Sequence, residues 1–179
     1  MRLILASTSP RRHELLTLLG LPFDVVAPPF VEQVRPHLPA QQQAIEFATG
    51  KARSCIASCP DALILGSDTL ISMGVEVLGK PVDLADAEAM LRRLAGQTHK
   101  IVTAVALTGP GSEPCDVHVA TVLVRMKPLN EEALAAYLRT GDSLGKAGAY
   151  SIQGGGAALI ERIEGDYTAA VGLPLRLVA

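Results

Sequence analysis

The first twelve residues constrain the fold more than any other stretch, because they join a strand to a helix through a short polar turn. Residues 3–6 form an apolar run typical of a buried strand. Ser9 is a good N-cap, and Pro10 suits the first helical position, where its missing N–H leaves no intrahelical bond unmade. A strand that leads directly into a helix is the start of an alternating α/β pattern.

The predicted helix start also carries two arginines. A capping box would favour Glu or Gln at the third helical position, but Arg12 occupies it and Arg11 stands beside it. Two cations at the positive end of a helix oppose the macrodipole, unless an anion binds there. Backbone N–H groups, the hydroxyls of Ser7, Thr8 and Ser9, and both guanidinium groups could then converge on a phosphate. We favour this anion site over a pair of solvated arginines on a surface turn.

The rest of the chain alternates helices with strands and then pairs its strands in hairpins. Helices are predicted at residues 10–19 and 41–58, and after the N-caps Asp83 and Asn130, with ends at Gly20, Gly96 and Gly141. Strands are predicted at residues 3–6, 23–27, 62–65, 99–108, 117–126 and 157–163, with a hairpin over 70–78 that turns near Gly74. This order predicts an α/β fold with a mixed sheet flanked by helices.

Composition excludes several classes of function. A chain of 179 residues can form one domain with a real core, or two lobes that share one sheet. A net charge of −2 and an aromatic content of 3% argue against nucleic-acid binding, since neither a basic excess nor stacking platforms are present. No apolar run approaches the length of a membrane span, and the N-terminus does not resemble a secretory signal. We therefore expect a cytoplasmic protein with no nucleic-acid or membrane partner.

The cysteines and histidines show no metal-binding pattern. Cys55, Cys59 and Cys115 are odd in number and lack zinc spacing, so we interpret them as reduced packing residues. Packing or solvated roles are also the better interpretation of the four scattered histidines, His13, His37, His99 and His118.

Asp68 is a candidate for chemistry. It follows the predicted buried strand 62–65, at the carboxyl end where α/β sheets bind ligands, and Gly66 and Ser67 let the chain turn there. A carboxylate near phosphates repels them unless it holds a hard cation or activates a water. The alternative is that Asp68 only caps a turn through its own backbone. The residues alone do not separate these two interpretations.

Three other charged residues gain interest beside Asp68. Glu32 could supply a second carboxylate to a metal, although alone it is a surface glutamate. Lys51 and Lys80 each have small neighbours that leave room for a ligand, although a single lysine is more often solvated.

The glycine-rich segment 145–156 could approach a ligand closely through its backbone. Gln153 could read a base edge, because its amide both donates and accepts hydrogen bonds. The alternative is a long surface loop with Tyr150 packed beneath it.

Several of these motifs together resemble the Maf family of nucleotide pyrophosphatases, and the match covers nearly the whole chain. The matching segments are LILASTSPRR at 3–12, KA at 51–52, GSDT at 66–69, GKP at 79–81, LAGQTH at 94–99, residues 145–154, GDY at 165–167 and VGLP at 171–174. The resemblance implies a single domain, residues 1–179, with a bent mixed sheet of Maf/ITPase-like fold and two lobes around a central cleft.

The family hydrolyses nucleoside triphosphates between the α- and β-phosphates with a divalent metal, Mg²⁺ or Mn²⁺, and releases pyrophosphate and a monophosphate. Residues 145–154 resemble the branch that acts on dTTP and UTP. The resemblance therefore implies an enzyme of nucleotide-pool housekeeping. The alternative is a non-hydrolysing nucleotide-binding regulator of cell division and septum formation, and a homodimer is compatible with either.

The resemblance also implies roles for single residues. Asp68 would be the catalytic base and would hold the metal with Glu32. The residues that would bind the substrate phosphates are Ser7, Arg11, Arg12, Lys51 and Lys80. Arg12, Thr69 and Gln153 would set specificity.

Three departures from the family pattern bear on these roles. Val31 replaces one of two adjacent acids near Glu32, which affects the expected metal geometry. Ser151 stands where this branch has glycine, which bears on base preference. The chain stops at Ala179, where relatives continue into a further helix, so we expect lower stability or an exposed edge there.

Overall fold

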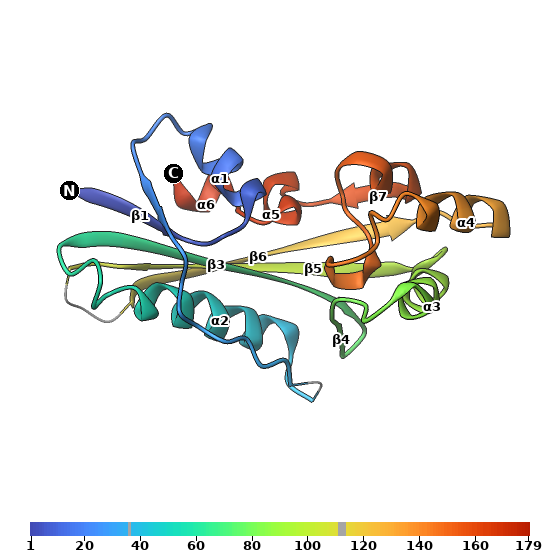
Figure 1. Ribbon diagram of the computed structural model, residues 1–179, viewed down its shortest axis with the longest axis horizontal. Helices are drawn as coiled ribbons and strands as arrows, with labels where there is room; N and C mark the ends of the chain where they lie inside the picture. The colour runs from blue at the N-terminus through green and yellow to red at the C-terminus, as the bar shows by residue number, and fades with distance from the viewer. Residues whose placement is uncertain (36, 111–113) are drawn as a thin grey trace.

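The computed structural model describes residues 1–35, 37–110 and 114–179, except for the side chains of residues 114 and 115. These residues form a seven-stranded sheet flanked by helices (Figure 1). In spatial order the strands are β2 (Asp24–Val26), β1 (Arg2–Ala6), β3 (Ala62–Met73), β5 (Thr98–Thr108), β6 (Pro114–Met126) and β7 (Ile160–Glu164), with β4 (Glu76–Leu78) paired to β3. β1 is parallel to β2 and β3, and the other pairs are antiparallel. The sheet is therefore mixed, which confirms the predicted α/β fold class.

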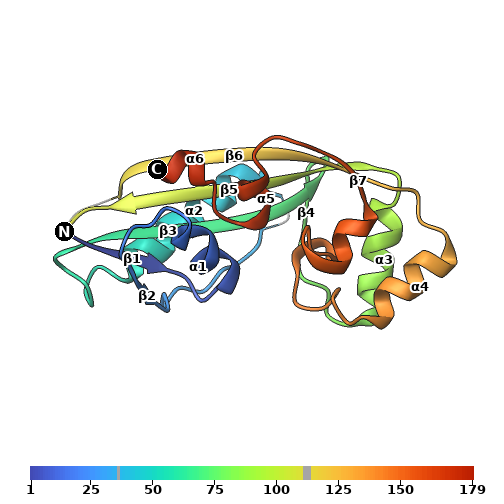
Figure 2. The same ribbon diagram turned by 90° about the horizontal axis from the view of Figure 1, so that it is seen from above.

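Helices cover both faces of the sheet and one end of the molecule. The helix on one face is α2 (Ala40–Ser54), and those on the other are α1 (Pro10–Thr17), α5 (Tyr167–Val171) and α6 (Leu175–Val178) (Figure 1). At one end lie α3 (Leu84–Leu94), α4 (Glu131–Arg139) and two short 3-10 helices, η1 (Ala147–Ala149) and η2 (Gly154–Leu159) (Figure 2). Across the described ranges, no helix combines the length and the apolar character that a membrane span needs. The division of residues 1–179 into two lobes of one domain stays a prediction.

The α2 helix packs closely on β3. Its Ala44, Phe47 and Ala48 are almost fully buried, at the helical spacing predicted from the sequence. A Cβ atom at Gly66 of β3 would clash with the backbone oxygen of Ala48, so glycine is needed for this close approach. The helix therefore lies directly beneath the part of β3 that leads to the site.

The helix boundaries follow the predicted capping residues. The Asp83 side chain accepts a hydrogen bond from the Asp86 backbone at the start of α3, and Asn130 does the same for Ala133 in α4. The glycines that follow the first, third and fourth helices have positive φ angles, as expected for helix ends: Gly20, Gly96 and Gly141. Ser9 differs from the prediction, because its side chain makes no capping bond to α1. The short helices α5 and α6 were not predicted, since four or five residues show no helical periodicity.

The cysteines agree with the prediction where the structure describes them. Cys55 and Cys59 are free and buried at the end of α2, and burial raises the pKa of the Cys55 thiol. The side chain of Cys115 lies outside the described residues.

The main correction to the predicted strands concerns β3. The strand predicted at 62–65 runs from Ala62 to Met73, so Asp68 lies in the middle of a strand and not after its end. The pairing with β5 keeps this stretch extended as far as Ser72. The opposite edge of β3 is different, because β1 ends opposite Gly66 and the pairing with β4 starts only at Ile71, which lies opposite Leu78, the last residue of β4. Residues 67–70 thus face a gap in the sheet, at the carboxyl end of β1.

Candidate active site

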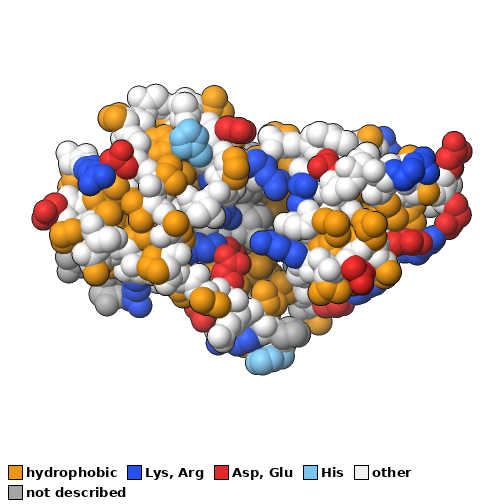
Figure 3. Space-filling model, viewed as in Figure 1, with side chains coloured by type: hydrophobic (Ala, Val, Ile, Leu, Met, Phe, Trp, Pro, Cys, Tyr) orange, Lys and Arg blue, Asp and Glu red, His pale blue; other side chains and the backbone are white. Residues whose placement is uncertain are grey.

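A cavity of about 540 Å³ opens at this gap. Its walls come from the turn after β1, the segment 28–32, the buried face of α2, the middle of β3 and the segments 145–152 and 170–172. The space-filling view shows basic and acidic side chains gathered around this hollow (Figure 3). Because no strand among the described residues pairs with β3 here on the β1 side, groups from both faces of the sheet reach the same cavity.

On the α2 side, a buried lysine bridges two carboxylates. Lys51 Nζ lies 2.6 Å from Asp68 Oδ1 and 2.5 Å from Glu32 Oε1. Asp68 is 3% exposed, and its Oδ2 atom has no hydrogen-bond partner among the described residues. Asp68 therefore lines the cavity with one oxygen held by an ammonium group and the other buried and unpartnered among the described residues. The interpretation of Asp68 as a turn cap is wrong, because it lies within a strand.

The two carboxyl groups respond differently to this environment. Burial raises the pKa of Asp68, against the opposing influence of Lys51 and Arg12. Burial also acts to raise the pKa of Glu32, but its hydrogen bond to Lys51 and the charges of Lys51, Lys80 and Arg12 lower it below the ordinary value. The pKa values of the two groups are thus shifted in opposite directions, that of Asp68 upward and that of Glu32 downward.

On the other face of β3, Arg12 is fixed by two acceptors. Its Nε donates to the Gly172 carbonyl oxygen at 2.9 Å, and its Nη2 donates to Thr69 Oγ1 at 3.2 Å. The same carbonyl accepts from Ser67 Oγ at 3.1 Å, which ties the start of the last segment to β3. Burial lowers the pKa of Arg12, while Asp68 and Glu32 raise it, and an arginine stays charged throughout.

The turn after β1 adds a second guanidinium and a hydroxyl. Arg11 Nη1 donates to Ser151 Oγ at 3.4 Å, which links α1 to the glycine-rich segment across the cavity. Ser7 Oγ accepts from the Ser9 backbone N–H at 3.1 Å. The α1 start therefore faces the cavity with both arginines, which are partly buried, so the alternative of two solvated arginines on a surface turn does not hold.

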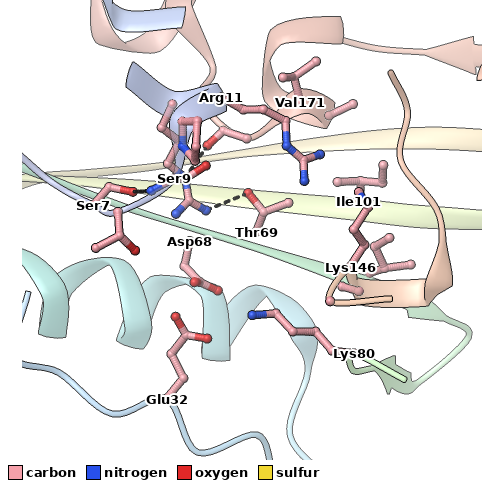
Figure 4. Close-up of a pocket in the computed structure, with 18 of the residues that line it drawn as sticks. Ser7, Ser9, Arg11, Glu32, Asp68, Thr69, Lys80, Ile101, Lys146 and Val171 are labelled. Carbon is pink, nitrogen blue, oxygen red and sulfur yellow. Dashed lines mark hydrogen bonds between the residues drawn. The ribbon is translucent and has the colours of Figure 1, made fainter. Parts of the chain in front are cut away.

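The structure brings eight of the nine predicted site residues to one cavity: Ser7, Arg11, Arg12, Glu32, Lys51, Asp68, Thr69 and Lys80. Figure 4 labels all of these except Arg12 and Lys51. In the close-up, the carboxylates of Glu32 and Asp68 point toward one another, and the ammonium of Lys80 points toward both. Gln153 is not among the residues that line the cavity. It follows the loop that does so and begins η2 as its N-cap.

Sequence reasoning missed several lining residues. Ile71 and Ile101 face each other across β3 and β5, and this register cannot be read from either segment alone. Lys146 also lines the cavity, and its small neighbours Gly145 and Ala147 were the same signal that pointed to Lys51 and Lys80. Its ammonium donates to the Asp142 carbonyl oxygen at 2.8 Å.

Within the described part of the chain, no cluster of three or more His, Cys, Asp or Glu side chains could hold a metal ion. The two carboxylates of Glu32 and Asp68 still fit a hard cation, because the buried Asp68 Oδ2 lacks a partner. Such a site would be completed by substrate phosphate oxygens and water, as is common for Mg²⁺.

Comparison with known proteins identifies the relatives of this chain. A family model described as Maf-like protein matches residues 2–179. The chain belongs to the Maf family. A relative from Symbiobacterium thermophilum, named dTTP/UTP pyrophosphatase, is 49% identical over 97% of this chain and 89% of its own length. A relative of the same name from Salmonella typhimurium is 45% identical over 97% of this chain and 87% of its own.

The match of this Maf family member to its relatives confirms the resemblance that the motifs carry. Among solved structures, the Staphylococcus aureus Ham1 protein aligns with a TM-score of 0.48 and 14% identity, over 70% of this chain and 72% of that chain.

Proposed function

We propose that this Maf family member hydrolyses nucleoside triphosphates, dTTP and UTP foremost, to the nucleoside monophosphate and pyrophosphate. The proposal is supported by the names of relatives that share 40–49% of its residues over nearly its whole length. The observation that carries it is the unpartnered Oδ2 atom of Asp68, a buried carboxylate oxygen beside a cavity lined by cations.

The cavity suits a triphosphate in charge and in shape. Arg11 and Arg12 reach it from one face of the sheet, and Lys51 and Lys80 reach it from the other side. Guanidinium groups bind phosphate oxygens in pairs, and ammonium groups act as point charges. Since Arg12 is already fixed by Thr69 and Gly172, little side-chain freedom is lost when it binds a phosphate.

The chemistry assigned to Asp68 is general-base catalysis. A water molecule would give one proton to Asp68 Oδ2 while its oxygen attacks the α–β phosphoanhydride, and the bond to the bridging oxygen breaks to release pyrophosphate. Lys51 holds Oδ1 and so fixes the direction of the free oxygen. Burial, which raises the pKa of Asp68, makes this carboxylate a better proton acceptor than an exposed aspartate.

A divalent metal would be held by Glu32 and Asp68, with Mg²⁺ or Mn²⁺ as the candidates. When bound, it would neutralise phosphate charge and polarise the scissile bond. The arginines and lysines of the cavity bind and orient the triphosphate without the metal.

The experiment is a pyrophosphate-release assay on a panel of nucleoside triphosphates, with Mg²⁺, Mn²⁺ or EDTA, on wild type and Asp68→Asn. Loss of a general base should lower turnover by about a hundred- to ten-thousand-fold while nucleotide binding persists. Asp61→Asn is the matched control, because Asp61 is an exposed aspartate just before β3.

Wild-type turnover in Asp68→Asn would contradict the catalytic role. A wild-type protein that binds triphosphates without releasing pyrophosphate would instead be the nucleotide-binding regulator. The base-reading role of Gln153, the cytoplasmic location and the homodimer stay predictions.

A further inference from the structure

A buried hydrogen bond joins the core of the sheet to the cavity wall. His99 Nε2 lies 2.6 Å from the Tyr150 hydroxyl oxygen, and the two rings meet edge to face with centroids 5.4 Å apart. His99 on β5 is 1% exposed, and Tyr150 is 3% exposed. Tyr150 lines the cavity, whereas His99 does not, so the hydroxyl is held from behind the wall.

The segment before Tyr150 is bent sharply and held at two points. Gly148 and Ala149 both have left-handed backbone angles, with φ of 67° and 60°. Such a conformation is strained for alanine because of its Cβ atom. The Gly148 N–H donates to the Gly79 carbonyl at 3.0 Å, and the Ala149 N–H donates to that of Lys146 at 3.1 Å. A strained turn relaxes when its anchors are removed, so the position of Tyr150 depends on them.

The His99–Tyr150 pair stabilises the core less than two apolar side chains would, because it leaves a polar atom buried and unpaired within the described part of the chain. His99 Nδ1 is buried and has no hydrogen-bond partner among the described residues. Two apolar side chains of similar volume would fill this space without leaving a buried polar atom unpaired. The polar pair orients the Tyr150 side chain, because the hydrogen bond between His99 and the Tyr150 hydroxyl fixes the plane of the ring and its depth in the wall.

Tyr150 belongs to the apolar part of the cavity wall. Ile71, Ile101 and Ile152 line the cavity together with it. Ile71 lies three residues beyond Asp68 on β3, about 10 Å away at the rise of an extended strand. With the triphosphate at Asp68 and the cations, the apolar part is left for the nucleoside, whose base prefers nonpolar surfaces.

We infer that His99 and Tyr150 together determine base specificity, with His99 as a positioning residue that fixes the Tyr150 ring as the wall against which the base packs. The inference rests on the proposed hydrolysis of nucleoside triphosphates. A fixed wall limits the depth available to the base, so a one-ring pyrimidine fits and a two-ring purine is excluded. Without the hydrogen bond, the ring can retreat and the limit is relaxed.

The test measures kcat and KM for UTP, dTTP, ATP and GTP in Tyr150→Phe, which keeps the ring and removes the hydroxyl. The pyrimidine-to-purine ratio of kcat/KM should fall about tenfold, mainly because KM for purines decreases. His99→Gln retains a side-chain amide that can bond the phenol, so it should keep most of the wild-type ratio.

Two further variants separate specificity from stability. Tyr137→Phe also removes a buried hydroxyl, one that accepts from the Ser151 N–H at 3.4 Å, but Tyr137 does not line the cavity and its loss should leave the ratio unchanged. The double variant His99→Leu, Tyr150→Phe removes both polar partners, so it should be more stable than His99→Leu alone and still show the lowered ratio.

A wild-type ratio in Tyr150→Phe would overturn the inference, as would an equal fall in Tyr137→Phe. If Tyr150→Phe does not fold, the double variant decides by the same ratio. If the wild type hydrolyses none of the four nucleotides, the proposed function fails, and calorimetric binding of non-hydrolysable UTP and GTP analogues to the same variants then tests the wall by itself.

Discussion

The ammonium of Lys51 lies 2.6 Å from Asp68 Oδ1 in a pair whose side chains are only 9% and 5% exposed. The lysine compensates a carboxylate that has little contact with water, yet it leaves Oδ2 unpartnered. A buried pair of this kind is sensitive to the loss of one partner, because the other charge then stays buried alone.

Lys51→Met should therefore destabilise the protein by about 3 kcal/mol or more, measured by urea unfolding in EDTA. Without Lys51, burial raises the pKa of Asp68 still further above its unfolded value. The folded state then binds more protons than the unfolded state above pH ~4, so the stability of the variant falls as the pH rises through that window.

The control is the double variant Lys51→Met, Asp68→Asn, which leaves no buried charge and should recover much of the lost stability. A Lys51→Met protein with wild-type stability and a flat pH profile would show that the pair is better solvated than its geometry indicates.

His99 predicts a second pH effect of opposite sign. Burial lowers its pKa to about 4, from 6.5, so the folded state resists a proton that the unfolded state binds. The contribution of His99 to the free energy of unfolding should rise by up to about 3 kcal/mol from about pH 4 to about pH 6.5 and be constant above that range.

The matched comparison is the double variant His99→Leu, Tyr150→Phe, which lacks the titrating ring. Its stability should rise less steeply than that of the wild type between pH 4 and 6.5. Parallel curves would exclude His99 as the group responsible.

Arg12 should bind phosphate through a guanidinium that is already in place. Arg12→Ala should weaken triphosphate binding by about 1.5–3 kcal/mol, the scale of a charge-assisted contact. Arg12→Lys keeps the charge but not the fork that reaches Thr69 and Gly172, so it should restore only part of the affinity. Arg2→Ala is the control, because Arg2 is an exposed arginine paired with Asp24. Unchanged KM and kcat in Arg12→Ala would exclude the role.

The sequence predicted those structural features that depend on residues close together in the chain. The caps at Asp83 and Asn130 and the arginine-rich start of α1 were readable because each lies within one turn of helix. The length of β3 was not, since Gly66 and Ser67 indicate a turn, and their pairing with β5, together with that of Gly66 with β1, keeps them extended.

The candidate site shows the same division. Its charged residues could be proposed from short motifs, but their pairing could not. Lys51 meets Asp68 across 17 residues, and His99 meets Tyr150 across 51. Such contacts depend on strand register and on the way the chain returns to the sheet, which no local pattern carries. Gln153 fits this explanation, because its motif did not indicate that the cavity wall runs through Tyr150 and Ile152. Its base-reading role stays a prediction.

The last prediction concerns the order in which metal and nucleotide bind. Glu32 and Asp68 offer only two carboxylates, and Lys51 already holds one oxygen of each. Arg12 and Lys80 add positive charge to the same cavity and oppose a free divalent cation. A triphosphate reverses this balance, because it neutralises the cations and supplies further oxygen ligands. Mn²⁺ should therefore bind weakly to the protein alone, and about tenfold or more tightly when a non-hydrolysable UTP analogue is present.

Electron paramagnetic resonance of Mn²⁺ measures both affinities without turnover, after subtraction of the Mn²⁺ bound by the analogue in solution. Glu32→Gln should weaken the metal in the ternary complex, while Glu46→Gln, which changes an exposed glutamate on α2, should not. By linkage, Mn²⁺ must tighten the analogue by the same factor that the analogue tightens Mn²⁺. Tight Mn²⁺ binding to the nucleotide-free protein would mean that the lysine bridge gives way to the metal alone, and that the two carboxylates are a preformed metal site.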